Sequence, residues 1–180
     1  IFEGLYEWDY LTSPAKLNPV GAVALPEITD GGRTWTIRVK PGIRFTDDPV
    51  FHGNPREVTA DDWVYSLKRW LDPNLRRGGD PIVADLVVGA RAVVDAARKG
   101  GAAFDYDKQI AGLRALDRYT VQLKLIEPNY PNIQNLLTQC AVAREVVEAA
   151  GGDIRARPVG TGPYRLKEWR RASRVVLEAN

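Results

Sequence analysis

The cluster of side chains best suited to metal binding or acid–base catalysis is Asp47, Asp48 and His52, the last being the only histidine of the chain. These residues lie in a loop rich in Asp, Pro, Gly and Asn, residues 46–57, where such side chains commonly cap turns. Two adjacent carboxylates and one imidazole also leave a zinc-type site without a well-spaced third ligand. We therefore interpret the cluster as a structural or solvated loop and expect no metal and no cofactor. A hydrolase or transferase that uses these residues remains an alternative.

The other candidates for catalysis are incomplete. Ser66 and Ser173 lack the G-x-S-x-G pattern of a nucleophile elbow. Asp61 and Asp62 look like paired carboxylates, but they stand at the expected start of a helix, where capping and the helix dipole account for them. Cys140, the only cysteine, follows an apolar run and is best read as a small buried hydrophobe. We predict no catalytic residue.

The stretch GTGPY, residues 160–164, resembles a fragment of a glycine-rich nucleotide loop. A P-loop requires a Lys-Ser/Thr pair that opens a helix, and a dinucleotide fingerprint requires strand, loop and helix in that order. Here the glycine turn leads through Pro163 into a strand pattern. We therefore interpret the stretch as a turn and not as a phosphate site, and we predict that the protein is not an enzyme.

Composition limits the possible partners. The chain has 180 residues, enough for one domain or two small lobes. Its formal net charge is only +2, which gives no electrostatic case for nucleic acid. It has no run of about 18 apolar residues that could span a membrane. It begins at Ile1, contains no methionine and shows no signal peptide, and we expect it to be a piece of a longer protein.

Apolar spacing predicts four helices and an antiparallel arrangement of strands. Residues 35–39 alternate between apolar and polar, as expected of a half-buried strand. Thr59 and Asp62 form a capping-box pattern that opens a helix ending at Asp72-Pro73. Further helices are expected at 82–99, 131–138 and 143–150, and strands at 113–116, 119–125, 164–169 and 174–177. Strands with one solvent-exposed face, and helices packed on the other side, indicate the α+β class.

Two pairs of these strands should form hairpins. Asp117-Arg118 is the expected turn of the first. The expected turn of the second hairpin is the sequence RRAS. Strand alternation places the basic residues of this hairpin on a solvent-exposed face: Arg165, Lys167, Arg170, Arg171 and Arg174. An interaction module that binds an acidic protein partner through the hairpin 165–174 is therefore a second alternative.

Five stretches in series resemble one family, the extracellular solute-binding proteins of peptide-type ABC transporters (family 5), which includes oligopeptide-, dipeptide- and nickel-binding receptors. They cover nearly the whole chain, in the order and approximate spacing of that family: IFEGLYEWD, LPEITDGGRTWTIRVKPGIRFTDD, REVTADDWVYSLKRWLDP, LRALDRYTVQLKLIEPNYP and PVGTGPYRLKEWRRASRVVLEAN.

The resemblance implies a fold and a division into domains. The chain would be part of a type II (cluster C) periplasmic binding protein, with an antiparallel or mixed sheet and helices packed on it. Residues 20–157 would form the small second domain, and residues 1–19 and 158–180 would be strips of the first domain. The opposing lobe would be absent from this chain. GTGPY would be the return crossing between the two domains, close to the ligand cleft.

The resemblance also implies where a ligand would lie. Contacts are expected from the return crossing, Gly160, Thr161, Gly162, Pro163 and Tyr164. A second set is expected from the linker region 79–85, in particular Pro81, Ile82 and Asp85. The letters RRGGD in this linker replace an aromatic-bearing stretch found in some peptide binders.

By the same resemblance the longer protein would be a monomer that captures a small solute, in the first place a short peptide, and delivers it to an ABC permease. ATP would be hydrolysed by a separate subunit. The protein would be periplasmic, or lipid-anchored outside the cell. Nickel chelates, oligosaccharides and haem are the other ligands that the family implies.

Overall fold

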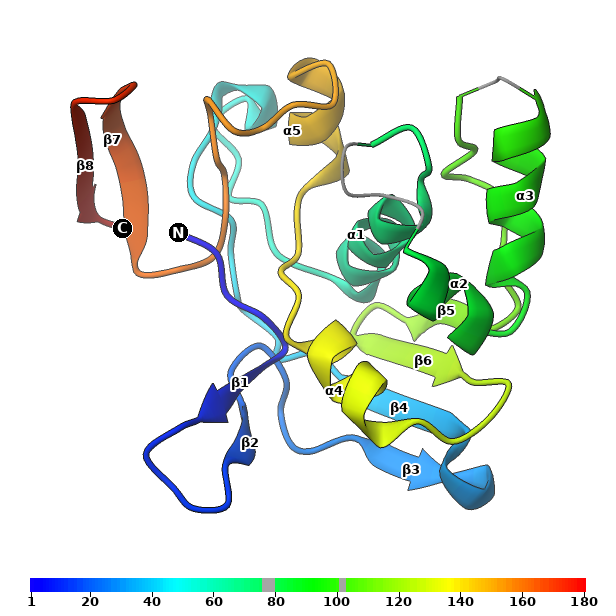
Figure 1. Cartoon of the computed structure of the whole chain (residues 1–180). Coiled ribbons are helices and arrows are strands. Elements are labelled where there is room, and N and C mark those ends of the chain that lie inside the picture. Colours follow the sequence, from blue (N-terminus) through cyan, green and yellow to red (C-terminus); the bar gives the residue numbers. More distant parts are fainter. Residues whose placement is uncertain (76–79, 101–102) are drawn as a thin grey trace.

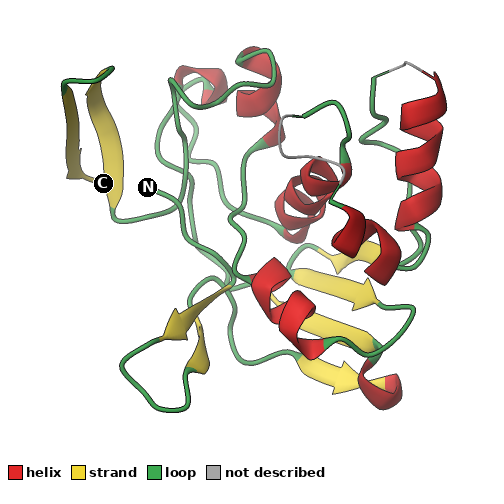
Figure 2. Ribbon diagram, viewed as in Figure 1, coloured by secondary structure: helices red, strands yellow, loops and turns green. Residues whose placement is uncertain are grey.

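The computed structural model describes residues 1–75, 80–100 and 103–180 of the chain. Its centre is an antiparallel four-stranded sheet with the strand order β3-β4-β6-β5. The strands are β3 (Glu27–Thr29), β4 (Thr34–Arg38), β5 (Leu113–Asp117) and β6 (Thr120–Lys124). The α-helices of the described residues are α1 (Ala60–Leu71), α2 (Pro81–Leu86), α3 (Ala90–Gly100), α4 (Tyr130–Leu137) and α5 (Arg144–Ala149). Figures 1 and 2 show α1, α2 and α4 next to the sheet and α5 farther from it. The predicted α+β class is confirmed.

Two short hairpins stand outside this sheet. The first pairs β1 (Tyr6–Asp9) with β2 (Lys16–Pro19), and the second pairs β7 (Tyr164–Arg170) with β8 (Arg174–Ala179). In Figure 1 both lie on the side of the molecule away from α2 and α3. The alternating strands near the C-terminus therefore form a hairpin of their own and do not join the central sheet.

The core sits between the sheet and the helices. Alternation in β4 buries Trp35 and Ile37, and the same pattern in β6 buries Val121 and Leu123. Helix α1 packs against β5 and β6. Burial of these apolar side chains is the main favourable contribution to folding. The indole of Trp35 is satisfied inside the core, because its Nε1–H donates to the carbonyl of Gly32 at 2.9 Å.

Three helix boundaries follow their local signals. The capping box predicted at Thr59 and Asp62 is present at the start of α1. The Asn129 side chain caps α4 by accepting from the Asn132 N–H. After α5 the chain turns through Gly151 and Gly152, both with positive φ, the backbone region in which glycine has no steric cost.

The helix predicted over residues 82–99 is wrong in one respect, because it is broken into α2 and α3. At the break, Val88 N–H donates to the Lys124 carbonyl at 3.0 Å, and Gly112 N–H donates to the Val88 carbonyl at 2.8 Å. Gly89 then turns the chain with a φ of +82°. Pairing with a distant strand end thus replaces the helical hydrogen bonds that the apolar spacing alone would favour.

The first hairpin turn is displaced by one residue from its prediction. The turn residues are Arg118 and Tyr119, and β6 begins at Thr120. The Asp117 carboxylate accepts a hydrogen bond from the Tyr119 N–H at 2.8 Å. This side-chain cap fixes the turn one residue later than the two-residue hairpin rule suggests.

Candidate functional site: the crossing segments

Segments that are far apart in sequence cross one another beside the central sheet, near the N-terminus in Figure 1. We call residues 1–5, 19–22, 42–48, 138–141 and 157–163 the crossing segments. They are joined through their backbones. Gly21 N–H donates to the Gly4 carbonyl at 3.2 Å, Thr46 N–H to the Gly160 carbonyl at 2.8 Å, and Gly162 N–H to the carbonyl of Ile1 at 2.7 Å.

Glycines allow this close crossing. A Cβ atom on Gly160 would lie 2.3 Å from the Ile1 carbonyl oxygen, and one on Gly4 would lie 2.6 Å from the Thr138 carbonyl oxygen. On Gly162 it would lie 2.8 Å from the same Ile1 oxygen. Such distances exclude any side chain unless the backbone moves. The glycines of GTGPY are therefore needed for close backbone contact, in agreement with their interpretation as a turn.

A buried carboxylate fixes residues 157–163 to the loop 46–51. The Asp48 side chain is only 3% exposed and receives two N–H groups of Arg157, one of them Nε at 2.6 Å. It also accepts from the Val50 N–H at 3.0 Å, and the Thr46 hydroxyl donates to the Gly160 carbonyl at 3.1 Å. Burial by itself would raise the pKa of Asp48, but the hydrogen bonds from Arg157 and Val50, with the charge of Arg157, lower it.

The other members of the first candidate cluster, Asp47 and His52, do not converge on Asp48. Asp47 and His52 are exposed, and His52 ends the short helix η2 (Pro49–Phe51) in a left-handed conformation with a φ of +53°. Asp48 caps that helix through Val50, as the structural interpretation of the loop predicts. Across residues 1–75, 80–100 and 103–180, no group of three or more His, Cys, Asp or Glu side chains is placed to hold a metal ion.

The predicted ligand-binding residues fall in two separate places. In the GTGPY stretch, Gly160 and Gly162 are buried, Thr161 is partly exposed, and Pro163 and Tyr164 are exposed. Pro81, Ile82 and Asp85 are exposed residues of α2, which Figure 1 shows on the other side of the molecule. Asp85 accepts from Arg91 Nε at 2.7 Å. Gly79 lies outside the described residues. The role of both sets toward a ligand stays a prediction.

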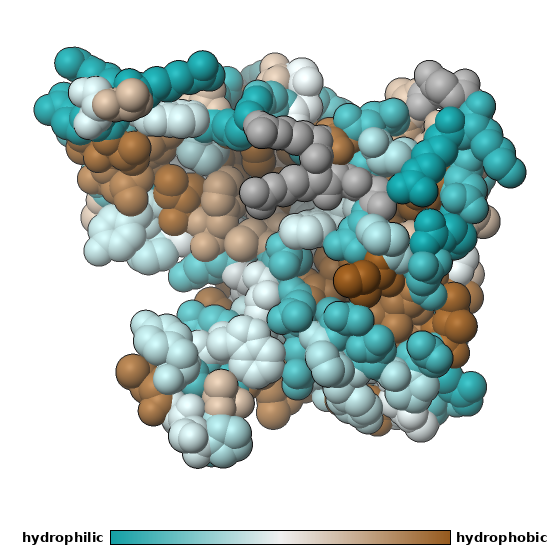
Figure 3. Space-filling model, in the orientation of Figure 1, coloured by the Kyte–Doolittle hydropathy of each residue, from teal (hydrophilic) through white to brown (hydrophobic). Residues whose placement is uncertain are grey.

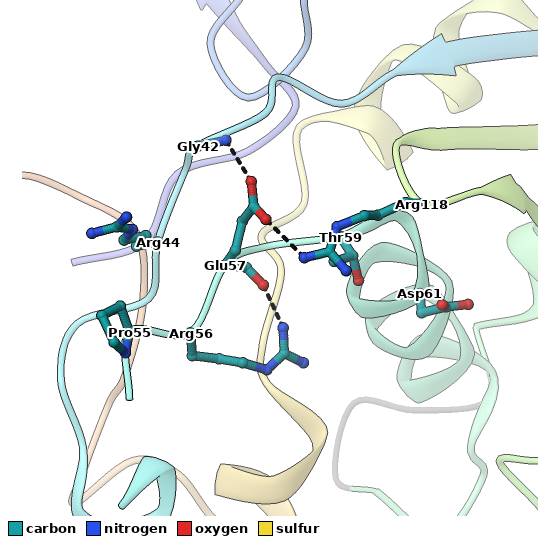
Figure 4. A pocket seen from close by; sticks show the side chains of 8 residues that line it. All are labelled: Gly42, Arg44, Pro55, Arg56, Glu57, Thr59, Asp61 and Arg118. Carbon is teal, nitrogen blue, oxygen red and sulfur yellow. Dashed lines mark hydrogen bonds and ion pairs between the residues drawn. The ribbon is translucent and has the colours of Figure 1, made fainter. Parts of the chain in front are cut away.

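A polar pocket of about 880 Å³ adjoins the crossing segments, and the sequence analysis missed it. Figure 4 shows the Glu57 carboxylate in the middle of its lining residues, which are Gly42, Arg44, Pro55, Arg56, Glu57, Thr59, Asp61 and Arg118. Because these come from separate loops and a helix start, no local motif announces the pocket. The signals available in the sequence were Glu57, which precedes the helix cap Thr59, and Arg118 in the hairpin turn.

The charges of this pocket largely satisfy one another. The Glu57 carboxylate accepts from Arg118 at 2.8 Å, from the Gly42 N–H at 2.7 Å and from the Tyr119 hydroxyl at 3.0 Å. These three interactions, with Arg118 the largest, lower the pKa of Glu57 to about 2. The Arg56 guanidinium is held by Asp62 and Glu145 at 2.7 and 2.6 Å. The pocket wall is thus an ion-pair network that links α1, α5 and the first hairpin turn.

Comparison with known proteins identifies the family. The family described as bacterial extracellular solute-binding proteins, family 5 Middle, matches residues 16–180. The chain belongs to this family. It is a family of binding proteins and not of enzymes, and so the enzymatic alternative based on Asp47, Asp48 and His52 finds no support in the comparison.

Individual relatives agree with this assignment. The chain is 30% identical over 194 residues to the periplasmic oligopeptide-binding protein OppA of Salmonella typhimurium, covering 100% of this chain and 30% of the relative. The oligopeptide-binding protein OppAIV of Borrelia burgdorferi matches with a TM-score of 0.78 and 23% identity, over 100% of this chain and 33% of that protein. NikZ of Campylobacter jejuni, solved with Ni(L-His), matches with a TM-score of 0.71 and 18% identity, over 100% of this chain and 30% of that protein.

These matches confirm that the fold is part of the type II periplasmic binding protein fold. The chain spans about 30% of the length of the relatives that it matches. Among the residues that the structure describes, no helix is both long enough and apolar enough to cross a membrane.

Proposed function

We propose that the chain is part of the substrate-binding component of an ABC transporter. The whole protein captures a small solute outside the membrane, in the first place a short peptide, and passes it to a membrane permease. The observation that carries this proposal is the family match over residues 16–180, together with a relative named for oligopeptide binding that aligns with the whole chain. Since the family is extracellular by description, we place the whole protein in the periplasm or anchored by lipid outside the cell. We further propose that it acts as a monomer.

The domain division is part of the proposal. The central sheet and the five helices all fall between Glu27 and Ala149, and these elements support one small domain over residues 20–157. The two hairpins outside the sheet support the assignment of residues 1–19 and 158–180 to a different domain. The crossing segments join the two. Pockets between domains are common ligand sites, and in this proposal the solute lies where the missing lobe closes on the first domain.

Within this arrangement, Thr161, Pro163 and Tyr164 are the ligand contacts that the return crossing offers, along with the backbone of Gly160 and Gly162. These assignments rest on position, because the residues lie at the end of the crossing segments, and on exposure, because Tyr164 is 52% exposed. Pro81, Ile82 and Asp85 form the second proposed set. Ile82 is 53% exposed, but Asp85 is engaged by Arg91, so any ligand contact there competes with an existing ion pair.

The test is a native mass spectrum of the whole protein purified from its own cells. A heterogeneous set of peptide masses is expected, because a receptor that holds the peptide backbone tolerates different side chains. A single non-peptide mass, such as a nickel chelate, keeps the transport role and overturns the peptide assignment. A protein that carries no solute and binds none from a peptide mixture at micromolar concentration overturns the proposal.

A further inference from the structure

The central sheet has one face covered by helices and one face open to solvent. Trp35 and Ile37 of β4, with Val121 and Leu123 of β6, lie on the covered face. Alternate residues of a strand point to opposite faces, and directly paired residues share a face. The open side, which we call the outer face, therefore consists of these residues: Glu27, Thr29, Thr34, Thr36, Arg38, Arg114, Asp117, Thr120, Gln122 and Lys124.

Every side chain of the outer face is polar, and only Thr120 is buried. A solvated polar face is the ordinary outcome for an antiparallel sheet, but here its charges are unequal. The face holds three cations, and the alternation continues past β4 to a fourth, Lys40, which is exposed while Val39 is buried. Its carboxylates are Glu27 and Asp117. In Figure 3 the lower right rim of the molecule, where β3 and β4 lie in Figure 1, is mainly hydrophilic or neutral.

Most of this positive charge is not neutralised within the described part of the chain. Arg38 interacts with Asp117 through its charge. Lys40, Arg114 and Lys124, in contrast, have no ion-pair partner and donate no side-chain hydrogen bond among the described residues. Three cations of one surface are therefore free to interact with an external anion.

The basic residues of the β7–β8 hairpin differ in this respect, because Glu168 and Glu178 neutralise most of them. The ion pairs are Arg165–Glu178, Lys167–Glu178, Arg170–Glu168 and Arg174–Glu168. This pairing weakens the alternative of an acidic protein partner for residues 165–174. The other face of the hairpin is apolar, and its Trp169, Val175 and Leu177 are exposed.

We propose that the outer face, together with Lys40, is a docking surface for the anionic headgroups of a phospholipid membrane. The inference rests on the proposed function, in which the protein works outside a membrane and passes its solute to a permease in that membrane. Anionic headgroups form a plane of negative charge, and each Lys or Arg side chain close to such a plane strengthens binding by about five-fold. The two carboxylates on the same face keep the association weak and reversible.

The geometry of the outer face suits a plane of headgroups. Arg114 is paired with Gln122, two residues from Lys124, so Arg114 and Lys124 are diagonal neighbours with Cα atoms about 7–8 Å apart. The threonine hydroxyls and the Gln122 amide between the cations are hydrogen-bond donors for phosphate oxygens. A protein partner fits less well, because the centre of a protein interface is apolar and no apolar residue belongs to the outer face.

Vesicle sedimentation of the whole protein, purified free of any attached lipid, tests this proposal. We expect binding to phosphatidylglycerol vesicles and not to phosphatidylcholine vesicles, and loss of that binding at high salt, which screens exposed charges. Arg114→Gln combined with Lys124→Gln should lower the partition coefficient about 20-fold. The Tm should stay the same, because both side chains are exposed.

The matched control combines Lys99→Gln with Lys108→Gln. Both lysines are exposed, and they lie in α3 and in the loop before β5, outside the outer face. This variant loses the same net charge and should bind nearly as well as the parent protein. Equal losses for the two double variants overturn the proposal, because the attraction then comes from net charge alone. Equal binding to the two lipids, or binding to neither, also overturns it.

Glu27→Gln gives a test that damage to the fold cannot imitate. It removes a repulsive charge from the outer face and should strengthen binding to phosphatidylglycerol several-fold; unchanged or weaker binding contradicts the proposal. Inorganic phosphate at constant ionic strength should not compete, and if it displaces the vesicles the surface binds free phosphate instead. These readouts need no solute, so failure to find one by native mass spectrometry would leave them unchanged.

Discussion

Replacing Asp48 with asparagine tests how residues 157–163 are held against the loop 46–51. The substitution keeps the side-chain volume and an oxygen that accepts from the Val50 N–H, and it removes the charge that binds Arg157. Breaking a fully buried ion pair costs about 3–5 kcal/mol. Here Asp48 is 3% exposed but Arg157 is 51% exposed, so water can solvate the released guanidinium. We therefore expect a loss of ~1.5–3 kcal/mol in the free energy of unfolding, the range for a hydrogen bond to a charged group.

The pH dependence gives this prediction a distinct signature. The pKa of Asp48 is lowered in the folded chain, while an unfolded aspartate titrates near pH ~3.9. A lowered folded pKa contributes stability that is complete above the unfolded pKa and is lost as the pH falls through the folded one. The gap between the parent chain and Asp48→Asn should thus be largest near neutral pH and shrink below pH ~4.

Urea unfolding followed by circular dichroism from pH 7 to pH 3 measures this gap. The matched control is Asp47→Asn, because Asp47 is the adjacent residue and its side chain is exposed; its effect should stay within about 0.5 kcal/mol. If the two asparagine variants unfold at the same urea concentration at pH 7, the ion pair does not hold the crossing. A gap that persists unchanged at pH 3 would show that the effect comes from packing and not from charge.

Two further pairs of substitutions probe the crossing segments and the core. Gly160→Ala forces a Cβ to 2.3 Å from a backbone oxygen and should cost ~1–3 kcal/mol, with faster hydrogen exchange at the crossing; Gly53→Ala, at a φ of +78° in open space, should cost about 1 kcal/mol and leave that exchange unchanged. Trp63 is buried and its Nε1–H has no partner among the described residues, so Trp63→Phe should cost ~1 kcal/mol less in urea unfolding than Trp35→Phe, which loses the hydrogen bond to Gly32.

Local signals were sufficient wherever the competing interactions were also local. The capping box at Thr59 and Asp62 predicted the start of α1, since both partners lie within one turn of helix. The glycines at 151 and 152 predicted the end of α5 for the same reason. The alternation in β4 predicted its buried face, because the period of a strand fixes side-chain direction whatever its neighbours are. The family resemblance of the quoted stretches added the fold and the proposed role.

Other features depended on contacts between distant residues. The break between α2 and α3 is set by pairing of Val88 with Lys124 and Gly112, and helical spacing carries no information about such a partner. The polar pocket likewise gathers residues from separate loops, so no single stretch predicts it.

The sequence by itself determined the class of fold, most of the helix and strand positions, the family and the interpretation of GTGPY as a turn. The class of fold, the element positions and the turn follow from spacing or residue type within a short window, whereas the family follows from the resemblance of five stretches along the chain. Only the tertiary structure decided that Asp48 binds Arg157, 109 residues away, and that the β7–β8 hairpin keeps an open apolar face. The physical reason is that a carboxylate or an apolar side chain has several possible partners, and the folded chain selects one of them by proximity.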